Sequence, residues 1–334
     1  MADIAVIGAG SYGTCLAILA ANAGHQVAFW CRDPAAAQVL SETRTSSYLP
    51  GFALPAGVIV TADLAAAVTG KQLVLGVTPS HAIRSVLGRA AAYLDPDVIV
   101  VNASKGLEEG TLQTIDHVYR DIFPARIAAR ATYLSGPTFA AEIAAGMPAA
   151  IVLAGTDPVA TAQAQKTLSN ERFRIYSTDD VTGVLVGGAI KNVVAIAAGV
   201  SDGLGLGSNA RAALITRGLA EITRVGVAMG AHAATFAGLS GMGDLVLTCA
   251  GDASRNRKVG LALGRGQSME DILRDMRMVA EGVNTTKVAH ELARKVGVPA
   301  PITDVMYEIV HRGAPARETM TKLMQRALRT ERDA

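Results

Sequence analysis

The residues best suited to acid-base chemistry in this chain are a lysine and an aspartate that both lie among apolar residues and glycines. Lys191 belongs to a helical stretch, 181–199, that is apolar on every side, so we expect the helix and its lysine to be buried. Desolvation lowers the pKa of a lysine toward the range in which the amine both gives and takes a proton. A lysine that snorkels to water is the poorer explanation, because its neighbours Ile190 and Val193 are apolar.

Asp244 is the expected partner of this lysine. It lies in a stretch of glycines and apolar residues, where an unpaired carboxylate would be costly to bury. The helix of the lysine also contains Gly187 and Gly188, and each glycine inside a helix costs about 0.5 to 1 kcal/mol relative to alanine. We therefore expect something to approach the backbone closely at these two glycines.

Hydrogen-bond donors gather at one predicted helix start and have the chemistry of a phosphate site. Ser254, Arg255 and Asn256 supply hydroxyl, guanidinium and amide groups where the helix dipole also favours an anion. The alternative is a solvated basic face. Lys105 follows a predicted strand, and ligands of open parallel sheets bind beyond the carboxyl ends of strands, so it is a second candidate for holding an oxygen. An incidental surface lysine is the alternative there.

The first residues of the chain have the pattern of a dinucleotide-binding turn. A buried-strand run from Asp3 ends in G-x-G-x-x-G at Gly8, Gly10 and Gly13, and a helical pattern follows at once. Gly8 allows the tight turn, Gly10 lets the backbone approach a pyrophosphate, and Gly13 lets the helix pack close to the strand. A second strand at the spacing of a βαβ unit favours this interpretation over an ordinary glycine-rich turn.

The end of the second predicted strand bears on the choice of cofactor. NAD sites usually place a carboxylate there for the ribose hydroxyls, whereas a 2′-phosphate requires a cation. Arg32 stands at this position and can pair with a 2′-phosphate, so the sequence favours NADP (NADPH), with NAD as the alternative. The other interpretation is that Arg32 stacks on the adenine while Asp33 caps a helix that begins at Pro34.

Composition and charge narrow the class of protein. The chain has 334 residues, of which 50% are hydrophobic, enough for a large core and two domains. Its formal net charge of +2 selects neither nucleic acid nor an anionic membrane as a partner. Cys15, Cys31 and Cys249 are expected to be buried thiols of a reducing compartment, and the histidines lack zinc-site spacing. We expect a cytoplasmic protein with no metal, no signal segment and no membrane span.

Strand and helix patterns alternate in the first half of the chain and give way to helices alone in the second. We expect an α/β fold with a Rossmann-type doubly wound parallel sheet in residues 1–179 and an all-helical domain in residues 180–334. The predicted strands are 3–8, 26–30, 58–61, 73–77, 98–102, 132–135, 150–154 and 172–176. The predicted helices include 79–94, 111–122, 157–168, 181–200, 208–229, 269–276, 284–296, 302–312 and 318–329.

Ordered sequence blocks along nearly the whole chain resemble the bacterial-type NAD(P)-dependent glycerol-3-phosphate dehydrogenases. The most specific blocks are Lys-Asn at 191–192, Asn-Ala-Arg at 209–211 and Ser-Arg-Asn-Arg at 254–257. The glycine turn, Ser-Lys-Gly at 104–106, Leu-Ser-Gly-Pro-Thr-Phe-Ala at 134–140 and Glu-Gly at 281–282 accompany them. The resemblance implies reversible reduction of dihydroxyacetone phosphate to sn-glycerol 3-phosphate, feeding phospholipid synthesis, by a cytoplasmic homodimer.

The resemblance also implies a role for each matching residue. Lys191 is then the proton donor and acceptor, and Asp244 is its electrostatic partner. As hydride reaches the ketone carbon, negative charge grows on the ketone oxygen, and an ammonium beside that oxygen stabilises the charge and then protonates the oxygen. The residues implied at the substrate are Lys105, Gly136, Thr138, Lys191, Asp244, Ser254, Arg255 and Asn256. Besides the three glycines, those implied at the cofactor are Ser11, Tyr12, Arg32, Lys105, Ala140, Arg255, Val279 and Glu281.

Two other functions are compatible with parts of this pattern. A dehydrogenase of similar build that acts on a β-hydroxy acid such as 6-phosphogluconate would also use a Lys-Asn helix after a Rossmann domain, and it predicts turnover of a carboxylated substrate. A non-catalytic dinucleotide sensor would have no need for a buried lysine, a buried aspartate and a separate basic helix start.

Overall fold

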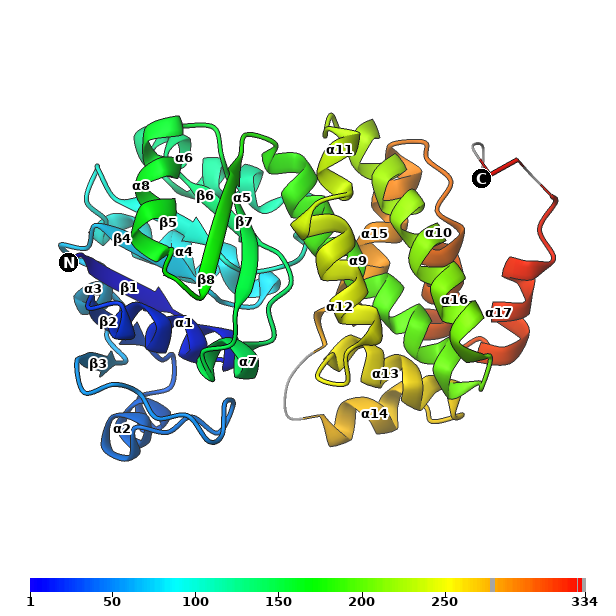
Figure 1. Cartoon of the computed structure of the whole chain (residues 1–334), viewed down its shortest axis with the longest axis horizontal. Coiled ribbons are helices and arrows are strands. Elements are labelled where there is room, and N and C mark those ends of the chain that lie inside the picture. Colours follow the sequence, from blue (N-terminus) through cyan, green and yellow to red (C-terminus); the bar gives the residue numbers. More distant parts are fainter. Residues whose placement is uncertain (277–279, 329, 332–334) are drawn as a thin grey trace. The chain divides into compact units, whose positions relative to one another are not determined.

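The computed structural model describes residues 1–276, 280–328 and 330–331, and the chain divides into two compact units. The first unit, Met1–Lys105 and Gln113–Val181, contains an eight-stranded sheet, and the second is helical (Figure 1). The second unit begins at Thr182 and also includes the short segment Gly106–Leu112, which a single boundary between residues 179 and 180 does not anticipate. Each unit has its own hydrophobic core.

The sheet has the strand order β3-β2-β1-β4-β5-β6-β7-β8. Strands β1 to β6 are parallel, and their order is that of the Rossmann dinucleotide fold. All eight predicted strands are present, with small differences at their ends. Their bounds are β1 Asp3–Ile7, β2 Gln26–Trp30, β3 Val58–Thr61, β4 Leu73–Gly76, β5 Ile99–Asn102, β6 Thr132–Ser135, β7 Ala149–Gly155 and β8 Phe173–Thr178.

The prediction of a wholly parallel sheet is wrong for the last two strands. Strand β7 pairs antiparallel with β6, placing Leu134 opposite Leu153, and β8 is parallel to β7. A parallel partner would need a crossover connection built on a helix long enough to return the chain to the starting edge. The connection from β6 to β7 contains only the short helix α7, Ala140–Ala144, so the chain turns back instead.

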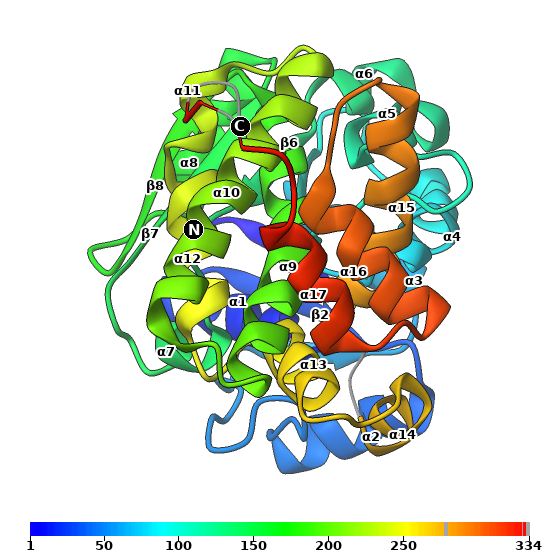
Figure 2. The same ribbon diagram turned by 90° about the vertical axis from the view of Figure 1, so that its right-hand side faces the viewer.

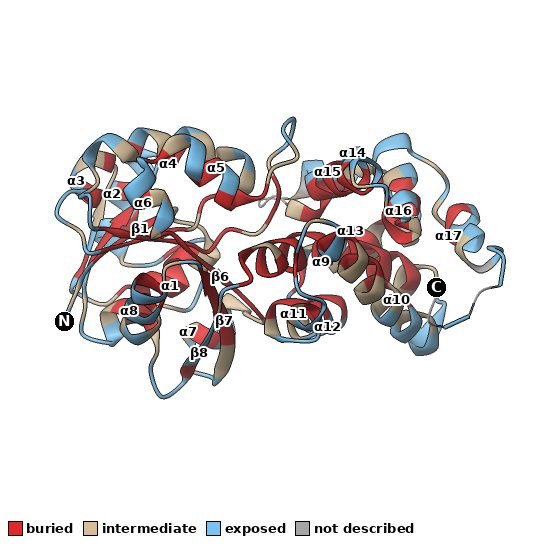
Figure 3. Cartoon of the chain, turned by 90° about the horizontal axis from the view of Figure 1, so that it is seen from above, coloured by how far each residue is buried: buried red, intermediate tan, exposed pale blue. Residues whose placement is uncertain are grey.

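Helices cover both faces of the sheet, which confirms the doubly wound arrangement. Helices α1 and α8 lie on one face, and α3, α4 and α5 lie on the other (Figure 3). The predicted helix 111–122 begins only at Ile115, because Leu112 has a positive φ of 59° that interrupts a right-handed helix. The bounds in this unit are α1 Ser11–Asn22, α2 Pro34–Thr43, α3 Leu64–Val68, α4 Ile83–Ala90, α5 Ile115–Ile122, α6 Ala125–Ala129, α7 Ala140–Ala144 and α8 Pro158–Leu168, with 3-10 turns Ser80–Ala82 and Ala91–Tyr93 beside α4.

The second unit is built around α9, Val181–Gly203, whose residues from Val193 to Ala198 are completely buried (Figure 3). Helices α15, α16 and α17 follow one another along the chain and pack in that sequence (Figure 2). The predicted helix 318–329 ends at Met324, and residue 329 lies outside the described residues. The other bounds are α10 Gly207–Ala228, α11 Ala233–Phe236, a π-helical turn Leu239–Gly243, α12 Asp244–Ala250, α13 Arg255–Gly264, α14 Met269–Asp275, α15 Glu281–Lys295, α16 Pro301–Arg312 and α17 Ala316–Met324.

By length and composition, two helical segments of the described chain are apolar enough to cross a membrane, Val181–Gly203 and Ala233–Ala250. This differs from the expectation that the chain has no such segment. The most apolar stretch of α9 is 100% buried inside the protein, and this burial is typical of a core helix. Its apolar composition is therefore explained by packing within the helical unit.

Candidate active site

The turn between β1 and α1 has the geometry that its glycines predict. Gly8 has a φ of +120°, and a Cβ there would lie 2.7 Å from the carbonyl oxygen of Val77. A Cβ on Gly13 would lie 1.8 Å from the carbonyl oxygen of Gly8, so the helix packs against the strand at a distance that only glycine permits.

The start of α1 can accept a pyrophosphate. No side chain caps its first turn, which contains no acidic residue, and a Cβ on Gly10 would meet no atom within 4 Å. The positive end of the helix dipole is thus open to an anion at the place where the sequence predicted one. Ser11 is the first residue of α1, and Tyr12 packs against the core of the sheet unit.

At the end of β2, both interpretations of the sequence remain compatible with the structure. Arg32 is exposed and makes no hydrogen bond or ion pair with the part of the chain that the structure describes, so its guanidinium is available to a phosphate or to an adenine. Asp33 caps α2, because its Oδ1 accepts hydrogen bonds from the amides of Ala35 at 2.9 Å and Ala36 at 3.5 Å. Pro34 occupies the first helical position.

The turns after β5 and β6 bring three of the predicted substrate residues together. The Nζ atom of Lys105 donates to the carbonyl oxygen of Gly136 at 3.0 Å, and the hydroxyl of Thr138 donates to the same oxygen at 3.2 Å. The buried hydroxyls of Thr78 and Ser135, near the ends of β4 and β6, have no hydrogen-bond partner among the described residues. The half-buried Lys105 and Thr138 therefore lie beyond the carboxyl ends of parallel strands, where ligands of such sheets bind.

Lys191 and Asp244 form the buried ion pair that the sequence predicts. The Nζ atom of Lys191 lies 2.5 Å from Oδ1 of Asp244 and 2.7 Å from the hydroxyl oxygen of Thr248. The two charged residues are 5% and 1% exposed, so the lysine does not snorkel to solvent. The hydroxyl of Thr248 donates to the backbone oxygen of Asp244 at 2.6 Å, which leaves its lone pair directed to the ammonium.

The close approach expected at Gly187 comes from the chain itself. A Cβ on Gly187 would lie 2.8 Å from the carbonyl oxygen of Ser240, in the π-helical turn that precedes α12. The glycine therefore lets this turn pack on α9, which places Asp244 beside Lys191. The sequence identified the tight contact but not the segment that makes it.

The start of α13 is tied to α9 and α15 by side-chain amides. Asn256 donates to Oδ1 of Asn192 at 2.8 Å, and its own Oδ1 accepts from the amide of Gly282 at 2.9 Å. Ser254 caps the helix by accepting from the amide of Arg257 at 3.2 Å. Arg255 is exposed in the same first turn. The predicted phosphate residues thus gather on the unit that contains Lys191.

Two of the remaining predicted cofactor residues occupy helix starts. Ala140 is the first residue of α7, and Glu281 is the first residue of α15 and is half-buried. Val279 lies outside the described residues.

Two residues of this site carry no role in the sequence analysis. Thr248 follows Asp244 by four positions, and residues at this spacing share a helix face, so its contact with Lys191 was accessible from the pattern. Asn192 is adjacent to Lys191, yet its bond to Asn256 joins two helices far apart in the sequence. No local signal predicts that second contact.

The cysteines have the burial that is typical of structural thiols. All three thiols are buried and free, as predicted. Burial raises the pKa of Cys15 and of Cys249 to about 12, so both remain protonated near neutral pH. Among the described residues, no cluster of histidine, cysteine, aspartate and glutamate could hold a metal ion.

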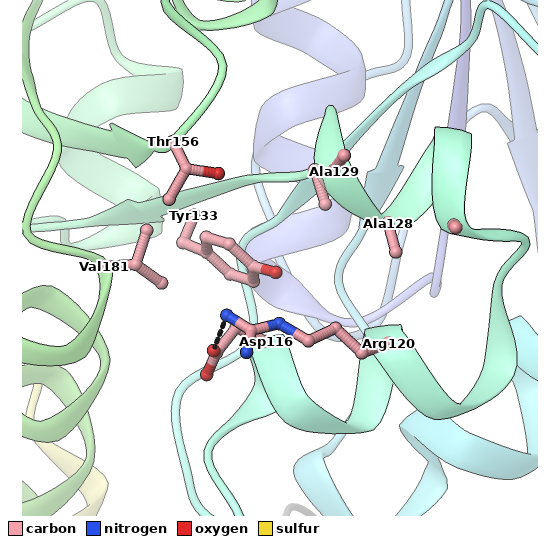
Figure 4. Close-up of a pocket in the computed structure, with 9 residues that line it drawn as sticks. Asp116, Arg120, Ala128, Ala129, Tyr133, Thr156 and Val181 are labelled. Atoms are coloured by element: carbon pink, nitrogen blue, oxygen red, sulfur yellow. Dashed lines mark hydrogen bonds and ion pairs between the residues drawn. The ribbon is translucent and has the colours of Figure 1, made fainter.

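A cavity of about 260 Å³ in the sheet unit is separate from the predicted residues. Asp116, Arg120, Tyr133, Thr156 and Val181 line it together with small alanines (Figure 4). Arg120 and Asp116 form an ion pair at 3.1 Å in its wall. None of the predicted site residues contributes to this cavity.

Comparisons with known proteins agree over both units. Residues 3–161 match the family described as NAD-dependent glycerol-3-phosphate dehydrogenase N-terminus, and residues 180–321 match the corresponding C-terminus. A glycerol-3-phosphate dehydrogenase (NAD(P)+) of a Geobacter species is 51% identical over 329 residues, covering 98% of each chain. The enzyme of that name from Geobacter sulfurreducens is 51% identical over 330 residues, again covering 98% of each chain.

A solved structure gives the same result for the fold. The structure of glycerol-3-phosphate dehydrogenase from Coxiella burnetii has a TM-score of 0.92 to this chain at 36% sequence identity, covering 97% of this chain and 99% of that one.

Proposed function

Because the chain belongs to the NAD-dependent glycerol-3-phosphate dehydrogenase family, we propose that Lys191 is the residue that moves the proton in its reaction. The protein is an NAD(P)-dependent oxidoreductase that acts on a CH–OH group and has glycerol-3-phosphate dehydrogenase activity. In the reductive direction, the substrate is dihydroxyacetone phosphate and the product is sn-glycerol 3-phosphate. The observation that carries the proposal is the buried contact of Lys191 with Asp244.

The cofactor, when bound, supplies or accepts the hydride at the substrate carbon. The protein itself must stabilise the negative charge that develops on the substrate oxygen. The ammonium of Lys191 can donate a hydrogen bond to that oxygen, stabilise the developing alkoxide and protonate it. Asp244 and Thr248 accept hydrogen bonds from the amine at 2.5 and 2.7 Å, which fixes the position of the amine. In the oxidative direction, the neutral amine takes the proton back.

In this proposal the phosphate of the substrate binds the first turn of α13 through Ser254, Arg255 and Asn256. The support is the position of these residues at a helix start, where the helix dipole favours an anion and the exposed Arg255 supplies a guanidinium. Lys105, Gly136 and Thr138 contact the substrate as well, and their mutual hydrogen bonds hold them in one turn cluster.

The proposed cofactor contacts begin at the glycine turn and the start of α1. The residues are Gly8, Gly10, Ser11, Tyr12, Gly13, Arg32, Lys105, Ala140, Arg255, Val279 and Glu281. The further proposals are a homodimer in the cytoplasm and a role of the product in phospholipid synthesis.

The test of the activity is NADPH oxidation in the presence of dihydroxyacetone phosphate, compared with NADH and with the reverse oxidation of sn-glycerol 3-phosphate. Turnover of 6-phosphogluconate in place of these substrates would contradict the proposal. No turnover with any of them by the folded protein would favour a dinucleotide sensor.

We propose NADPH as the preferred cofactor, because Arg32 is exposed at the end of β2. If its guanidinium pairs with the 2′-phosphate, Arg32→Ala weakens NADPH binding by about 1.5 to 3 kcal/mol and changes NADH binding far less. Fluorescence titration of both cofactors measures this difference. Equal losses for the two cofactors would instead identify stacking on the adenine.

A further inference from the structure

Asp202, in the last turn of α9, holds two arginines from other helices. Its Oδ2 accepts from Nε and Nη2 of Arg257 on α13 at 3.0 and 2.7 Å. Its two oxygens also accept from Nη1 of Arg211 on α10 at 3.1 and 3.2 Å. The carboxylate side chain is only 10% exposed, and the Arg257 side chain is 14% exposed. These charge-assisted contacts are shielded from water, so they are stronger than an exposed ion pair.

By binding Arg257, Asp202 attaches the first turn of α13 to the end of α9. Arg257 occupies that turn, where its amide also donates to the capping hydroxyl of Ser254. Asn256, the preceding residue, is held by Asn192 at 2.8 Å. Arg255 therefore precedes two consecutive residues whose side chains are anchored to α9.

Close helix packing accompanies these bonds. A Cβ on Gly199 of α9 would lie 2.1 Å from the carbonyl oxygen of Arg257, and a Cβ on Gly260 of α13 would lie 2.0 Å from that of Ile196. Glycines on both helices thus bring the two backbones into contact. Lys191 lies on the same helix α9, about 16 Å along its axis from Asp202 at 1.5 Å per residue.

We propose that Asp202 is a positioning residue for the phosphate end of the substrate. Through Arg257, it fixes the first turn of α13, and hence Arg255, relative to the helix that carries the proton-transferring Lys191. This inference rests on the proposed binding of the substrate phosphate by Arg255. The ligand concerned is a phosphate monoester dianion on a three-carbon ketone or alcohol.

The test is a double-mutant cycle between Asp202→Asn and Arg255→Ala. Asp202→Asn retains the size of the side chain but removes its charge, so we expect the KM for dihydroxyacetone phosphate to rise about tenfold, which corresponds to about 1.4 kcal/mol. The turnover of unphosphorylated dihydroxyacetone remains near wild type, because this substrate lacks the phosphate that Arg255 is proposed to bind. In the Arg255→Ala background, Asp202→Asn adds less than about twofold, because the residue that it positions is absent.

The matched control is Asp252→Asn. Asp252 bonds the same guanidinium at 2.8 Å, but its side chain is 98% exposed, so we expect its loss to leave the KM for dihydroxyacetone phosphate near wild type. Arg257→Lys repeats the cycle if Asp202→Asn does not fold, because lysine retains the charge but cannot bond both carboxylates in the same fork geometry.

Two results would overturn the inference and are distinguishable. An equal rise in KM in both backgrounds means that Asp202 supports only the fold. If Arg255→Ala retains the full preference for dihydroxyacetone phosphate over dihydroxyacetone, the phosphate assignment itself is wrong, and Asp202 has nothing there to position.

Discussion

Asp244 and Glu221 are both carboxylates of the helical unit and both are 1% exposed, but their partners differ in kind. Asp244 on α12 faces the ammonium of Lys191. Glu221 on α10 accepts from the amides of Ile302 and Thr303 at 2.8 and 2.9 Å and from the hydroxyl of Thr303 at 2.6 Å.

The difference separates a chemical role from a structural one. The partners of Glu221 at the start of α16 are mainly backbone amides, which donate hydrogen bonds but do not exchange protons with a substrate. Glu221 thus caps the start of α16, although it belongs to a different helix that is far away in the sequence. In the proposed mechanism, Lys191 transfers a proton and Asp244 orients its ammonium. Burial of a carboxylate is therefore not a sign of catalysis until the chemistry of its partner is known.

The largest expected difference between the Lys191–Asp244 pair and the Glu221 cap is their effect on turnover. Lys191→Met removes the proton donor, so we expect kcat for dihydroxyacetone phosphate to fall at least about 10²-fold with NADPH affinity nearly unchanged. Glu221→Gln leaves kcat near wild type. Steady-state kinetics and cofactor titration on both variants measure this. Near wild-type turnover by Lys191→Met would remove the lysine from the mechanism.

The stability of that variant requires its own control. The sequence alone indicates that Lys191→Met folds because it removes a buried charge, but in the structure the substitution also removes the ammonium that faces the buried carboxylate of Asp244. We expect the double variant Lys191→Met/Asp244→Asn to be more stable than Lys191→Met while remaining equally inactive.

The next difference is in the free energy of unfolding. Asp244→Asn leaves a buried ammonium without its counter-charge and is expected to cost about 3 to 5 kcal/mol. Glu221→Gln retains one carbonyl oxygen as an acceptor and is expected to cost about 1 to 3 kcal/mol. Urea unfolding monitored by circular dichroism compares the two. A larger loss for Glu221→Gln would reverse the comparison.

The smallest expected effect is a pH dependence confined to the Glu221 region. Burial raises the pKa of Glu221 above its ordinary value of 4.5, although hydrogen bonds from Thr303 and Ile302 lower it in part. As pH rises above 4.5, the unfolded chain releases this proton before the folded protein does, so the Glu221 contribution to the unfolding free energy falls until the folded pKa is passed. At pH values below the pKa of Glu221 in the unfolded chain, Glu221 is protonated in both states and does not lower the unfolding free energy.

Glu221→Gln removes this titration. The unfolding free energy of the variant, relative to wild type, is therefore expected to increase as pH rises from 4.5. Denaturant unfolding across a pH series gives the difference directly. A difference that stays constant, or that decreases with pH, would show that the pKa of Glu221 is not raised by folding.

Residue types and short-range patterns were sufficient to predict the local elements and the kinds of chemistry. The apolar runs predicted all eight strands, the glycine pattern predicted the turn at Gly8, and an ionisable residue in an apolar helix predicted the burial of Lys191. Its pairing with Asp244 followed from the cost of leaving two buried charges apart. These features depend on residue type and short-range periodicity, which a sequence displays directly.

The contacts between segments far apart in the sequence were visible only in the folded protein. The tertiary structure set the antiparallel direction of β7, brought Ser240 to Gly187, joined Asn192 to Asn256, and placed Glu221 at the start of α16. Each of these contacts joins two segments, and the residue pattern of each segment would fit many other neighbours equally well. The choice among those neighbours depends on how whole helices and strands pack, and no local residue pattern encodes it.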